Sequence, residues 1–568
     1  MSCTSVECDV FQQLLAAAIL ACCSLASGRP NVVVLMADDL GYADVLGNST
    51  LPTPNIDSIA RRGATLTHHV AAAPVCTPSR AAFLTGRYPV RYGMESHGRN
   101  KVFLFVAASG GLPQSEITFP KVLQKNGYRT ALIGKWHLGN DGTRRKDMEH
   151  HPLRHGFDYF YGLPLTNLKD FGPNGKSVVT TYFPPFYSSL VAIICVGASI
   201  AYYLRTRRFL MMIIVFSLCL LPSLLAAFVY NLPRLNGMVM RGSEVVEQPL
   251  RLPGLTQRLV AEAKDFLGNT TTQQPFLLVV NFVHVHTALF TAPQFANVSV
   301  KHGEYGDNVM ELDWAVGEIL KELEDIGAAN NTLVYFSSDN GAHIEEVGPS
   351  GDRHGGCNLP FKGGKAMGGI EGGIRVPTAV MMPGVIPPGT IMNITTSQMD
   401  FFPTVLRAAN LEAPPVDLDG RDMLEGLIGR QQTATHKALM HYCGVSLHAI
   451  TLLPDDGNVY KVHYATPHWE PGTDHCPYVC HCLDGFVDYH EPPLVYNMTA
   501  DPSEASPLPP NLAEPIILEA DSARAAHQAT LPDPPPISQF STRNFLWKPW
   551  LQPCCNFPFC TCTDPRYP

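Results

Sequence analysis

The first part of the chain alternates short apolar runs with amphipathic segments. Apolar runs that predict buried strands cover residues 32–36, 130–134, 276–283 and 333–336, and helical patterns cover residues 56–62, 119–125, 255–266 and 308–323. Strands that are apolar throughout and separated by helices predict a mainly parallel sheet with helices on both faces. Functional groups of such α/β folds gather at the carboxyl ends of strands, so the polar residues after these runs are the first candidates for a site.

A different pattern interrupts this alternation. Residues 187–204 and 209–230 are almost wholly apolar, and the basic tetrapeptide 205–208 separates them. Each half approaches or meets the roughly 20 residues that a helix needs to cross a bilayer, and the basic turn fits the cytoplasmic side. We predict a transmembrane helical hairpin over residues 184–232 with both flanks in the lumen. A buried hairpin inside a large soluble domain is the alternative, and the lack of a polar face argues against it.

Beyond about residue 429 the pattern becomes rich in proline and cysteine, with short strand candidates at residues 460–464 and 494–496. This predicts a small C-terminal antiparallel α+β subdomain over residues 430–568. An even set of cysteines suggests that disulfides staple it. The set consists of Cys443, Cys476, Cys480, Cys482, Cys554, Cys555, Cys560 and Cys562. A zinc site is the alternative, although the spacing fits no common zinc pattern, and Cys357 is left over.

Composition and the N-terminus place the chain in the secretory pathway. At 568 residues the chain suits a large catalytic domain, here residues 29–183 and 233–429, plus a smaller partner. An apolar stretch at residues 14–25 followed by small residues predicts a signal peptide over residues 1–28, although Glu7 and Asp9 replace the usual basic flank. The formal charge of -9 gives no reason to expect nucleic acid as a partner. Glycosylation sequons occur at Asn48, Asn269, Asn297, Asn330, Asn393 and Asn497.

One short segment carries the strongest chemical signal. Cys76, Pro78 and Arg80 form a Cys-x-Pro-x-Arg pattern, which Leu84-Thr-Gly-Arg87 extends. This segment resembles the signature of the sulfatase family, in which the cysteine is oxidised to formylglycine during synthesis in the endoplasmic reticulum. A structural or disulfide-bonded cysteine is the alternative. Pro78 suits the first turn of a helix, so residue 76 is expected at a helix N-terminus, where amides and the dipole favour an anion such as sulfate.

The resemblance implies what residue 76 does. A hydrated aldehyde offers one oxygen to attack sulfur and a second oxygen to expel sulfate afterwards. An unmodified cysteine or serine cannot perform the second step, because its sulfate ester has no neighbouring hydroxyl to collapse it. The chain is therefore expected to be a sulfuric ester hydrolase that depends on a formylglycine-generating enzyme for its maturation. The family also implies an alkaline-phosphatase-like α/β fold.

Two acidic clusters follow predicted strands. Asp38 and Asp39 come after the strand at residues 32–36, and Asp339 and Asn340 come after the strand at residues 333–336. Carboxylate and amide oxygens form a hard ligand set that suits calcium, although one such pair alone is more often a solvated turn. By resemblance to the family, these four residues and the modified Cys76 are the ligands of one Ca²⁺.

Further segments match the family. They are the GKWHLG element at residues 134–139, the pair His284 and His286, and residues 362–377 around Lys365. By resemblance, Lys135 and Lys365 contact the sulfate, and Arg80 supports residue 76 and the metal carboxylates. The resemblance also implies that His137 takes a hydroxyl proton from residue 76 and that His286 protonates the leaving oxygen. A histidine that ends a strand is otherwise an ordinary surface group, so His286 rests on the family match.

Within the family, the chain resembles the members that hydrolyse steroid sulfates and their membrane-anchored arylsulfatase relatives. The predicted hairpin is the feature that most distinguishes these members from the soluble ones. Matching segments lie at residues 102–105, 109–113, 165–168, 284–290 and 545–551. By resemblance, an apolar rim for a sterol ring system consists of Val75, Val102, Leu104 and Val178. The hairpin implies contact with membrane lipid. We therefore expect the enzyme in the endoplasmic reticulum membrane or another secretory-pathway membrane, with the catalytic domain in the lumen.

Some features leave the substrate open between steroid sulfates and other aryl sulfates. Residues 171–176 lack a cysteine that these relatives use in a disulfide, Cys357 stands where none is expected, and residues 99–101 put more charge on the rim.

Two other classes of protein are alternatives to a sulfatase. A phosphatase or phosphodiesterase would share the fold but use Ser or Thr and two zinc ions. A non-catalytic membrane protein would be expected to lack one of the site residues, and none is missing.

Overall fold

The computed structural model describes residues 28–567 except for 48, 168–192, 195–196, 199, 201–227, 229–230, 233, 272, 347–353, 432, 477–479 and 484. Among these described residues, no helix combines the length and the apolar character needed to cross a bilayer. The predicted hairpin at residues 184–232 and the predicted signal peptide lie almost entirely outside the described residues, and Val178 lies outside them too. These features therefore stay predictions.

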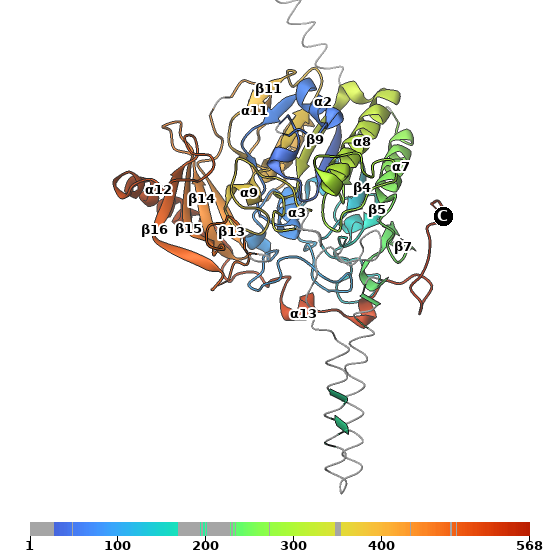
Figure 1. Cartoon of the computed structure of the whole chain (residues 1–568). Helices are drawn as coiled ribbons and strands as arrows, with labels where there is room; N and C mark the ends of the chain where they lie inside the picture. The colour runs from blue at the N-terminus through green and yellow to red at the C-terminus, as the bar shows by residue number, and fades with distance from the viewer. Residues whose placement is uncertain are drawn as a thin grey trace, which may run out of the picture.

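A ten-stranded sheet forms the centre of the molecule (Figure 1). Its strands follow the order β11 (Thr390–Met392), β2 (Ala64–Leu66), β10 (Thr378–Met381), β9 (Thr332–Ser338), β1 (Asn31–Ala37), β8 (Phe276–Asn281), β4 (Arg129–Lys135), β5 (Tyr159–Leu163), β6 (Val239–Arg241) and β7 (Glu244–Glu247). From β9 to β5 the strands pair in parallel, and antiparallel pairs flank this block. The predicted mainly parallel sheet is thus confirmed at its centre.

Both faces of the sheet are buried, as continuous apolar strands require. Along β1, Val32 and Val34 belong to one hydrophobic cluster, whereas Val33 and Leu35 belong to the cluster on the other face. The first cluster includes helices α3 (Cys76–Thr85), α4 (Phe119–Lys125) and α10 (Phe401–Ala408). The second cluster includes helices α2 (Pro54–Arg62), α7 (Leu255–Gly268) and α8 (Gly303–Asp325). The architecture is therefore a sheet between two helical layers.

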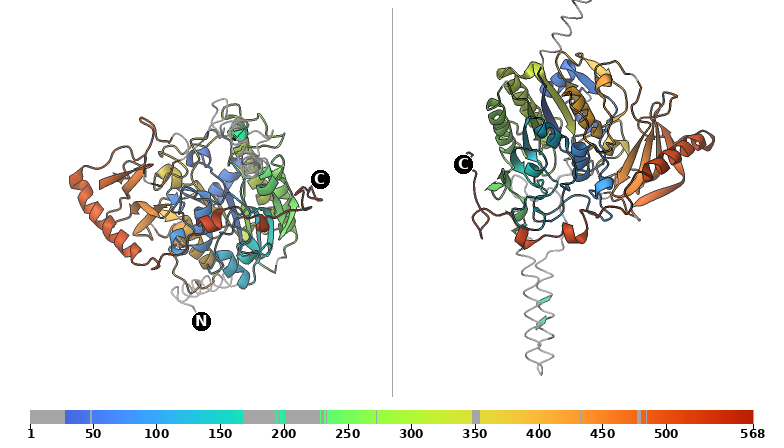
Figure 2. Two further views of the ribbon diagram at one scale, coloured as in Figure 1. Left: turned by 90° about the horizontal axis from the view of Figure 1, so that it is seen from below. Right: turned by 180° about the vertical axis from the view of Figure 1, so that it is seen from behind.

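The C-terminal region forms a separate antiparallel sheet that packs beside the catalytic domain. Its strands are β13 (Ala438–Cys443), β14 (Ser446–Leu452), β15 (Tyr460–Pro467) and β16 (Val487–Asn497), and helix α12 (Pro510–Gln528) covers one face. Figure 2 shows this sheet on the side of the molecule opposite α7 and α8. A shared hydrophobic cluster with Ala72, Ala82 and Tyr88 joins the sheet to the catalytic domain. The predicted antiparallel sheet with its helix is confirmed, but the last part of the range 430–568 packs against the catalytic domain, where Gln248 pairs with Cys562 and Arg241 pairs with Asp564.

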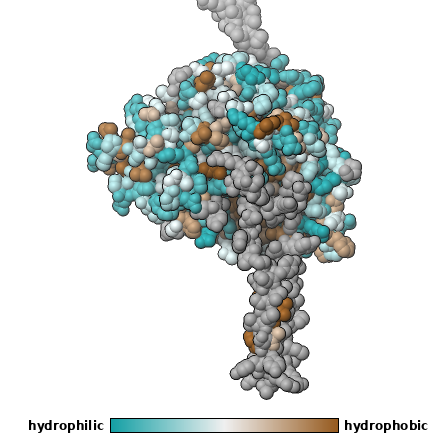
Figure 3. All heavy atoms as spheres, viewed as in Figure 1, coloured by the Kyte–Doolittle hydropathy of each residue, from teal (hydrophilic) through white to brown (hydrophobic). Residues whose placement is uncertain are grey.

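Short elements complete the described part of the chain. They are β3 (His69–Val70) paired with β12 (Thr396–Ser397), helices α9 (Glu371–Ile374), α11 (Leu424–Leu427) and α13 (Thr542–Phe545), and 3-10 helices at Tyr42–Asp44, Pro89–Tyr92, Pro152–Arg154, Ala329–Asn331, Gln398–Asp400 and Pro549–Leu551. On the face drawn in Figure 3, the described surface is mostly hydrophilic with scattered hydrophobic side chains. Such a surface is ordinary for a domain that faces water.

The eight C-terminal cysteines form disulfides. The pairs are Cys443–Cys482, Cys476–Cys480, Cys554–Cys560 and Cys555–Cys562. The zinc alternative is therefore wrong for these cysteines, and the predicted staples are confirmed. Within the described residues, Cys76 and Cys357 are the free cysteines.

Candidate active site

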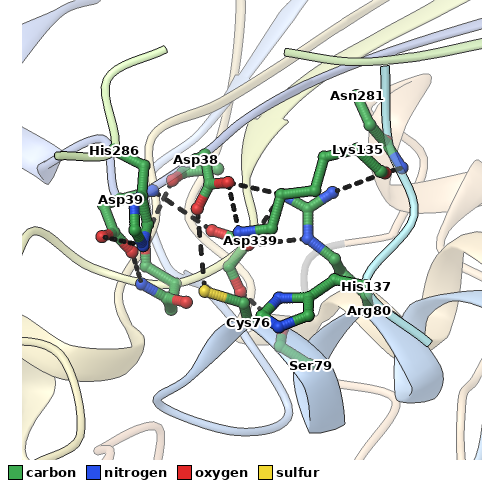
Figure 4. A network of polar contacts seen from close by, with 12 residues as sticks. Asp38, Asp39, Cys76, Ser79, Arg80, Lys135, His137, Asn281, His286 and Asp339 are labelled. Carbon is green, nitrogen blue, oxygen red and sulfur yellow. Dashed lines mark hydrogen bonds and ion pairs between the residues drawn. The ribbon is translucent and has the colours of Figure 1, made fainter. Parts of the chain in front are cut away.

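The polar ends of two neighbouring strands form the base of the site. Strands β1 and β9 pair in parallel along their whole length, so the residues that follow them meet at one edge of the sheet. The backbone amide of Asp39 donates to Oδ1 of Asp339 at 3.2 Å, and Nδ2 of Asn340 donates to Oδ1 of Asp39 at 2.7 Å. Asp38 lies beside them, and all four side chains are buried (Figure 4). The four predicted metal ligands are thus brought together.

Helix α3 brings Cys76 to the same edge. Cys76 is the first residue of the helix, Val75 is the N-cap without a side-chain cap, and all ten helical residues are buried. The Sγ atom of Cys76 lies 3.7 Å from Oδ1 of Asp38. Burial raises the pKa of the Cys76 thiol to about 12, so the unmodified side chain is neutral and a poor nucleophile at neutral pH. The helix N-terminus favours an anion at this position.

Three basic side chains pair with the three carboxylates. The contacts join Nζ of Lys135 to Oδ2 of Asp38 at 2.5 Å, Nζ of Lys365 to Oδ2 of Asp39 at 2.6 Å, and Nη2 of Arg80 to Oδ2 of Asp339 at 2.8 Å and to Oδ2 of Asp38 at 3.4 Å. The formal charges of these buried groups cancel. A bound divalent cation would make the cluster positive, which favours an anion such as the sulfate group of an ester.

The ion pairs shift the titration of their members. Burial alone would raise the pKa of Asp39, but Lys365 and His286 hold it well below its usual range. Burial alone would lower the pKa of Lys365, but the negative charge of Asp39 raises it above its usual value. Both groups are therefore charged over the whole physiological pH range, as an anion-binding and cation-binding site requires.

His137 presents a free ring nitrogen. Nε2 lies 3.0 Å from the carbonyl oxygen of Phe103, which can only accept, so Nε2 carries the proton of the neutral ring. Nδ1 is buried and has no hydrogen-bond partner among the described residues. Burial, and then Lys135, hold the pKa of His137 well below its usual value. The backbone carbonyl of His137 accepts from Oγ1 of Thr77, the residue after Cys76, which ties the His137 backbone to the start of α3.

Of the two neighbouring histidines after β8, His286 reaches the cluster. Its Nε2 lies 3.8 Å from Oδ2 of Asp39, and its Nδ1 donates to the carbonyl oxygen of Thr287 at 2.5 Å. Burial, and then Lys365, hold the pKa of His286 well below its usual value. Nε2 of His284 instead lies 2.9 Å from Oγ1 of Thr256 and 3.6 Å from Oε2 of Glu311, which is not one of the site carboxylates. The structure thus distinguishes the two histidines as the family resemblance did.

The donor atoms fit a hard cation. Ligand atoms of Asp38, Asp39, Asp339 and Cys76 all lie within 4.8 Å of one another. Oδ1 of Asn340 is buried without a hydrogen-bond partner among the described residues, as expected of an oxygen that binds a cation. Oxygen donors of this kind suit calcium, whereas zinc prefers nitrogen and sulfur. The residues present therefore fit a calcium ion.

Several supporting residues were not predicted from the sequence. The hydroxyl of Ser79 lies 2.5 Å from the carbonyl oxygen of Asp339 and 3.1 Å from Oε1 of Gln398. Nδ2 of Asn281 donates to the carbonyl oxygen of Lys135 at 2.8 Å. Asn281 lies inside the predicted strand at residues 276–283, and only the structure shows that β8 ends there. Gln398 had no signal, because only the fold brings it near α3.

The predicted apolar rim is described in part. Val75 is buried at the start of α3, and Val102 and Leu104 are partly buried on either side of the carbonyl that contacts His137. The carbonyl oxygen of Leu104 accepts from Nδ2 of Asn236 at 2.8 Å, which ties this stretch to the residues just after the predicted hairpin. Of the charged residues expected on the rim at residues 99–101, Lys101 is buried with Nζ 3.2 Å from Sγ of Cys443, whereas Arg99 is exposed. The prediction is therefore wrong for Lys101 only.

Comparison with known proteins agrees with this geometry. The chain matches the sulfatase family over residues 30–411 and the C-terminal region of aryl-sulfatase over residues 434–562. It is 46% identical to steryl-sulfatase of Homo sapiens over 565 residues, which cover 96% of this chain and 95% of the relative. It is 42% identical to arylsulfatase D of Homo sapiens, with 94% of this chain and 92% of the relative covered.

Solved structures show the same fold. The PsFucS1 sulfatase from Pseudoalteromonas sp. superposes with a TM-score of 0.70 at 26% identity, covering 91% of this chain and 94% of the other. A phosphonate monoester hydrolase of Agrobacterium radiobacter gives a TM-score of 0.51 at 15% identity, covering 89% and 96%, and shows the fold alone. The chain belongs to the sulfatase family, and it is a sulfuric ester hydrolase of the alkaline-phosphatase-like α/β fold.

Proposed function

We propose that the chain hydrolyses sulfate esters of steroids, with a formylglycine made from Cys76 as nucleophile and one bound Ca²⁺. The observation that carries this proposal is the buried cluster in which residue 76 meets three carboxylates and three cations. The similarity to human steryl-sulfatase over nearly the whole chain supports the steroid substrate. A non-steroid aryl sulfate is the second candidate, supported by the similarity to arylsulfatase D.

The basic side chains bind and neutralise the sulfate group. Lys135 and Lys365 each contact a carboxylate through the ammonium group, which has further protons available for sulfate oxygens. Arg80 holds Asp339 and Asp38 in place with its fork of donors. A bound Ca²⁺ would supply further stabilisation of negative charge on the sulfate oxygens. Formylglycine would supply, in its hydrated form, a nucleophilic hydroxyl with a second hydroxyl on the same carbon.

The two histidines move protons at the two ends of the reaction. His137 accepts a proton from residue 76 on Nδ1, the nitrogen that has no other partner among the described residues. His286 donates a proton from Nε2 to the oxygen of the leaving alcohol, because Nδ1 is held by the carbonyl of Thr287. The negative charge of a bound sulfate raises the pKa of His286 and so favours its protonated form.

We further propose an endoplasmic reticulum membrane location with the catalytic domain in the lumen. Four disulfides support an oxidising compartment. The two family matches, over residues 30–411 and 434–562, support a catalytic domain of residues 29–183 and 233–429 and a C-terminal subdomain of residues 430–568. The hairpin at residues 184–232 would hold the enzyme in lipid, where a hydrophobic sulfate ester concentrates.

The test is turnover of two substrates. The chain is expressed with a formylglycine-generating enzyme and extracted in detergent, and sulfate release is measured from a steroid sulfate and from 4-nitrophenyl sulfate. Cys76→Ala is the matched control. Turnover of the steroid ester that the variant abolishes supports the proposal, and turnover of the small ester alone supports the second candidate. No turnover of either ester, with formylglycine verified by mass at residue 76, contradicts both.

A further inference from the structure

The loop that carries Lys365 is fastened at both ends by the C-terminal sheet. At its start, Nζ of Lys362 donates to the carbonyl oxygen of Glu504 at 2.9 Å. At its end, the carbonyl oxygen of Gly369 accepts from Nζ of Lys461 at 3.0 Å, and the amide of Glu371 donates to Oε2 of Glu504 at 3.1 Å. The loop that supplies a site residue therefore depends on groups from a different part of the fold.

Between these ends, two backbone bonds hold the loop to the catalytic domain. The amide of Lys365 donates to the carbonyl oxygen of Ala342 at 3.0 Å, and the amide of Ala366 donates to the carbonyl oxygen of Pro74 at 2.7 Å. Ala366 has a φ of +68°, a conformation that a residue with a Cβ adopts only when its surroundings impose it. The position of Lys365 thus depends on the hydrogen bonds that hold the whole loop in place.

Lys461 is an unusual residue for a strand of a small sheet, because its side chain is fully buried. It lies on β15, and Nζ contacts Oε1 of Glu371 at 2.7 Å as well as the carbonyl of Gly369. The other oxygen of Glu371 accepts from Nε of Arg375 at 2.8 Å. Burial alone would raise the pKa of Glu371, but Arg375 and Lys461 hold it well below its usual value. A buried charge is tolerated only when it is fully paired, so this network constrains the loop end tightly.

Glu504 completes the fastening from the loop between β16 and α12. Its side chain is 3% exposed, and Oε1 contacts Nε2 of His463 at 2.6 Å while Oε2 accepts from the amide of Glu371. His463 and Lys461 both lie on β15. One strand and one loop of the C-terminal sheet therefore reach both ends of the segment that carries Lys365.

We infer that Lys461 and Glu504 of the C-terminal sheet are positioning residues for sulfate binding, because they fix the loop 362–371 and so set the place of the Lys365 ammonium. This inference rests on the proposed role of Lys365 in contacting sulfate. It gives the C-terminal sheet a part in the reaction, although no described residue of that sheet belongs to the carboxylate and cation cluster itself. Displacement of a charged group by about 1 Å can cost on the order of a hundredfold in rate.

A double-mutant cycle tests the inference in the full-length enzyme carrying formylglycine. Lys461→Met is combined with Lys365→Ala, and kcat, KM and inhibition by inorganic sulfate are measured with 4-nitrophenyl sulfate. Lys461→Met should lower kcat/KM about tenfold to a hundredfold and weaken inhibition by sulfate. In the Lys365→Ala background the same change should alter kcat/KM less than about twofold, because its effect acts through Lys365.

The outcomes distinguish a failure of the positioning role of Lys461 from a failure of the proposed contact between Lys365 and sulfate. If Lys365→Ala leaves kcat/KM and sulfate inhibition unchanged, the proposed role of Lys365 fails. If both single variants lose activity and their effects multiply, Lys461 does not act through Lys365 and the inference is overturned. If Lys461→Met does not fold, Glu504→Gln is carried through the same cycle and decides the question in the same way.

A matched control addresses a general loss of stability. Tyr464 lies on the same strand as Lys461, but its hydroxyl donates to Oδ1 of Asp521 on α12 at 3.0 Å, away from the loop. Tyr464→Phe should lower the unfolding temperature and leave kcat/KM and sulfate inhibition within about twofold of the original values. An equal loss of activity in Tyr464→Phe would show that any weakening of the sheet has this effect, and would overturn the inference.

Discussion

At the scale of single residues, the two site histidines differ in which ring nitrogen is engaged. In His137 the carbonyl of Phe103 occupies Nε2 and leaves Nδ1 available, whereas in His286 the carbonyl of Thr287 occupies Nδ1 and leaves Nε2. The family resemblance predicted both residues from the sequence. The tautomers could not be predicted, because they depend on backbone carbonyls that the fold places beside each ring.

An acid role for His286 predicts a dependence on the leaving group. His286→Gln should lower kcat/KM for a steroid sulfate by about 10²–10⁴-fold, since the steroid alkoxide is a poor leaving group without a proton. The loss for 4-nitrophenyl sulfate should be much smaller, because nitrophenolate leaves unprotonated. Steady-state kinetics with both esters measure this ratio. Equal losses for the two esters would contradict the role of His286 as acid.

The need for a second hydroxyl at residue 76 gives another prediction. Cys76→Ser places one hydroxyl at the N-terminus of α3 in the same buried surroundings. We expect no more than one equivalent of alcohol released per enzyme molecule and no steady-state turnover. Rapid-quench measurement of alcohol release gives the stoichiometry, and Cys76→Ala should release none. Continuous turnover by the serine variant would mean that one hydroxyl is enough.

At the scale of elements, the site residues lie at the ends of strands, and the positions of these ends were harder to predict than the strands themselves. The run at residues 333–336 predicted only the apolar part of β9, which extends through Ser337 and Ser338 because their hydroxyls are bonded inside the protein. Conversely, β8 ends at Asn281, although Phe282 and Val283 are apolar and buried. Periodicity therefore located the strands, but only the structure shows at which residue each strand ends and the site residues begin.

Ser79 links α3 to the end of β9, which gives a prediction for the element. Ser79→Ala removes a hydroxyl that contacts the carbonyl of Asp339 and Gln398, and it should cost about 1–3 kcal/mol of stability. We expect a lower unfolding temperature together with a lower kcat, because the Asp339 turn loses its support.

Ser58 on α2 offers a matched control for this prediction. Its hydroxyl donates to the carbonyl oxygen of Asn55 at 2.6 Å, in a helix that packs on the opposite face of the sheet from α3. Ser58→Ala should lower the unfolding temperature less and leave kcat unchanged in a thermal scan and a parallel assay. A Ser79→Ala enzyme with full activity would show that the α3–β9 link does not position Asp339.

At the scale of the whole molecule, the sequence predicted a catalytic domain with helices on both faces of its sheet and an antiparallel C-terminal sheet, but not the contacts between these two parts. The contact of Lys461 with Glu371 joins residues 90 positions apart in the chain, and neither had a pattern that pointed to the other. The predicted helices and strands were local features, which periodicity reveals. Buried ion pairs between domains are long-range features, and a single sequence carries no signal for them.

The three ion pairs of the site carboxylates predict how the enzyme responds to calcium removal. Each of the three carboxylates is paired with a lysine or arginine, so the fold should survive without the ion. We expect a chelator to abolish turnover while circular dichroism stays unchanged, and added Ca²⁺ to restore activity. The unfolding temperature should rise with the Ca²⁺ concentration, because the ion binds the folded state. Full activity after exhaustive chelation and dialysis would contradict a calcium requirement.

The burial of Cys76 has a consequence for the order of events in the life of the enzyme. A residue that is 1% exposed, on a helix buried along all ten positions, cannot enter the active site of another protein once the domain has closed. The proposed oxidation of the Cys76 thiol to formylglycine must therefore finish before helix α3 docks into the domain. A chain that folds before this oxidation would be stable but permanently inactive, and no later treatment short of unfolding would restore its activity.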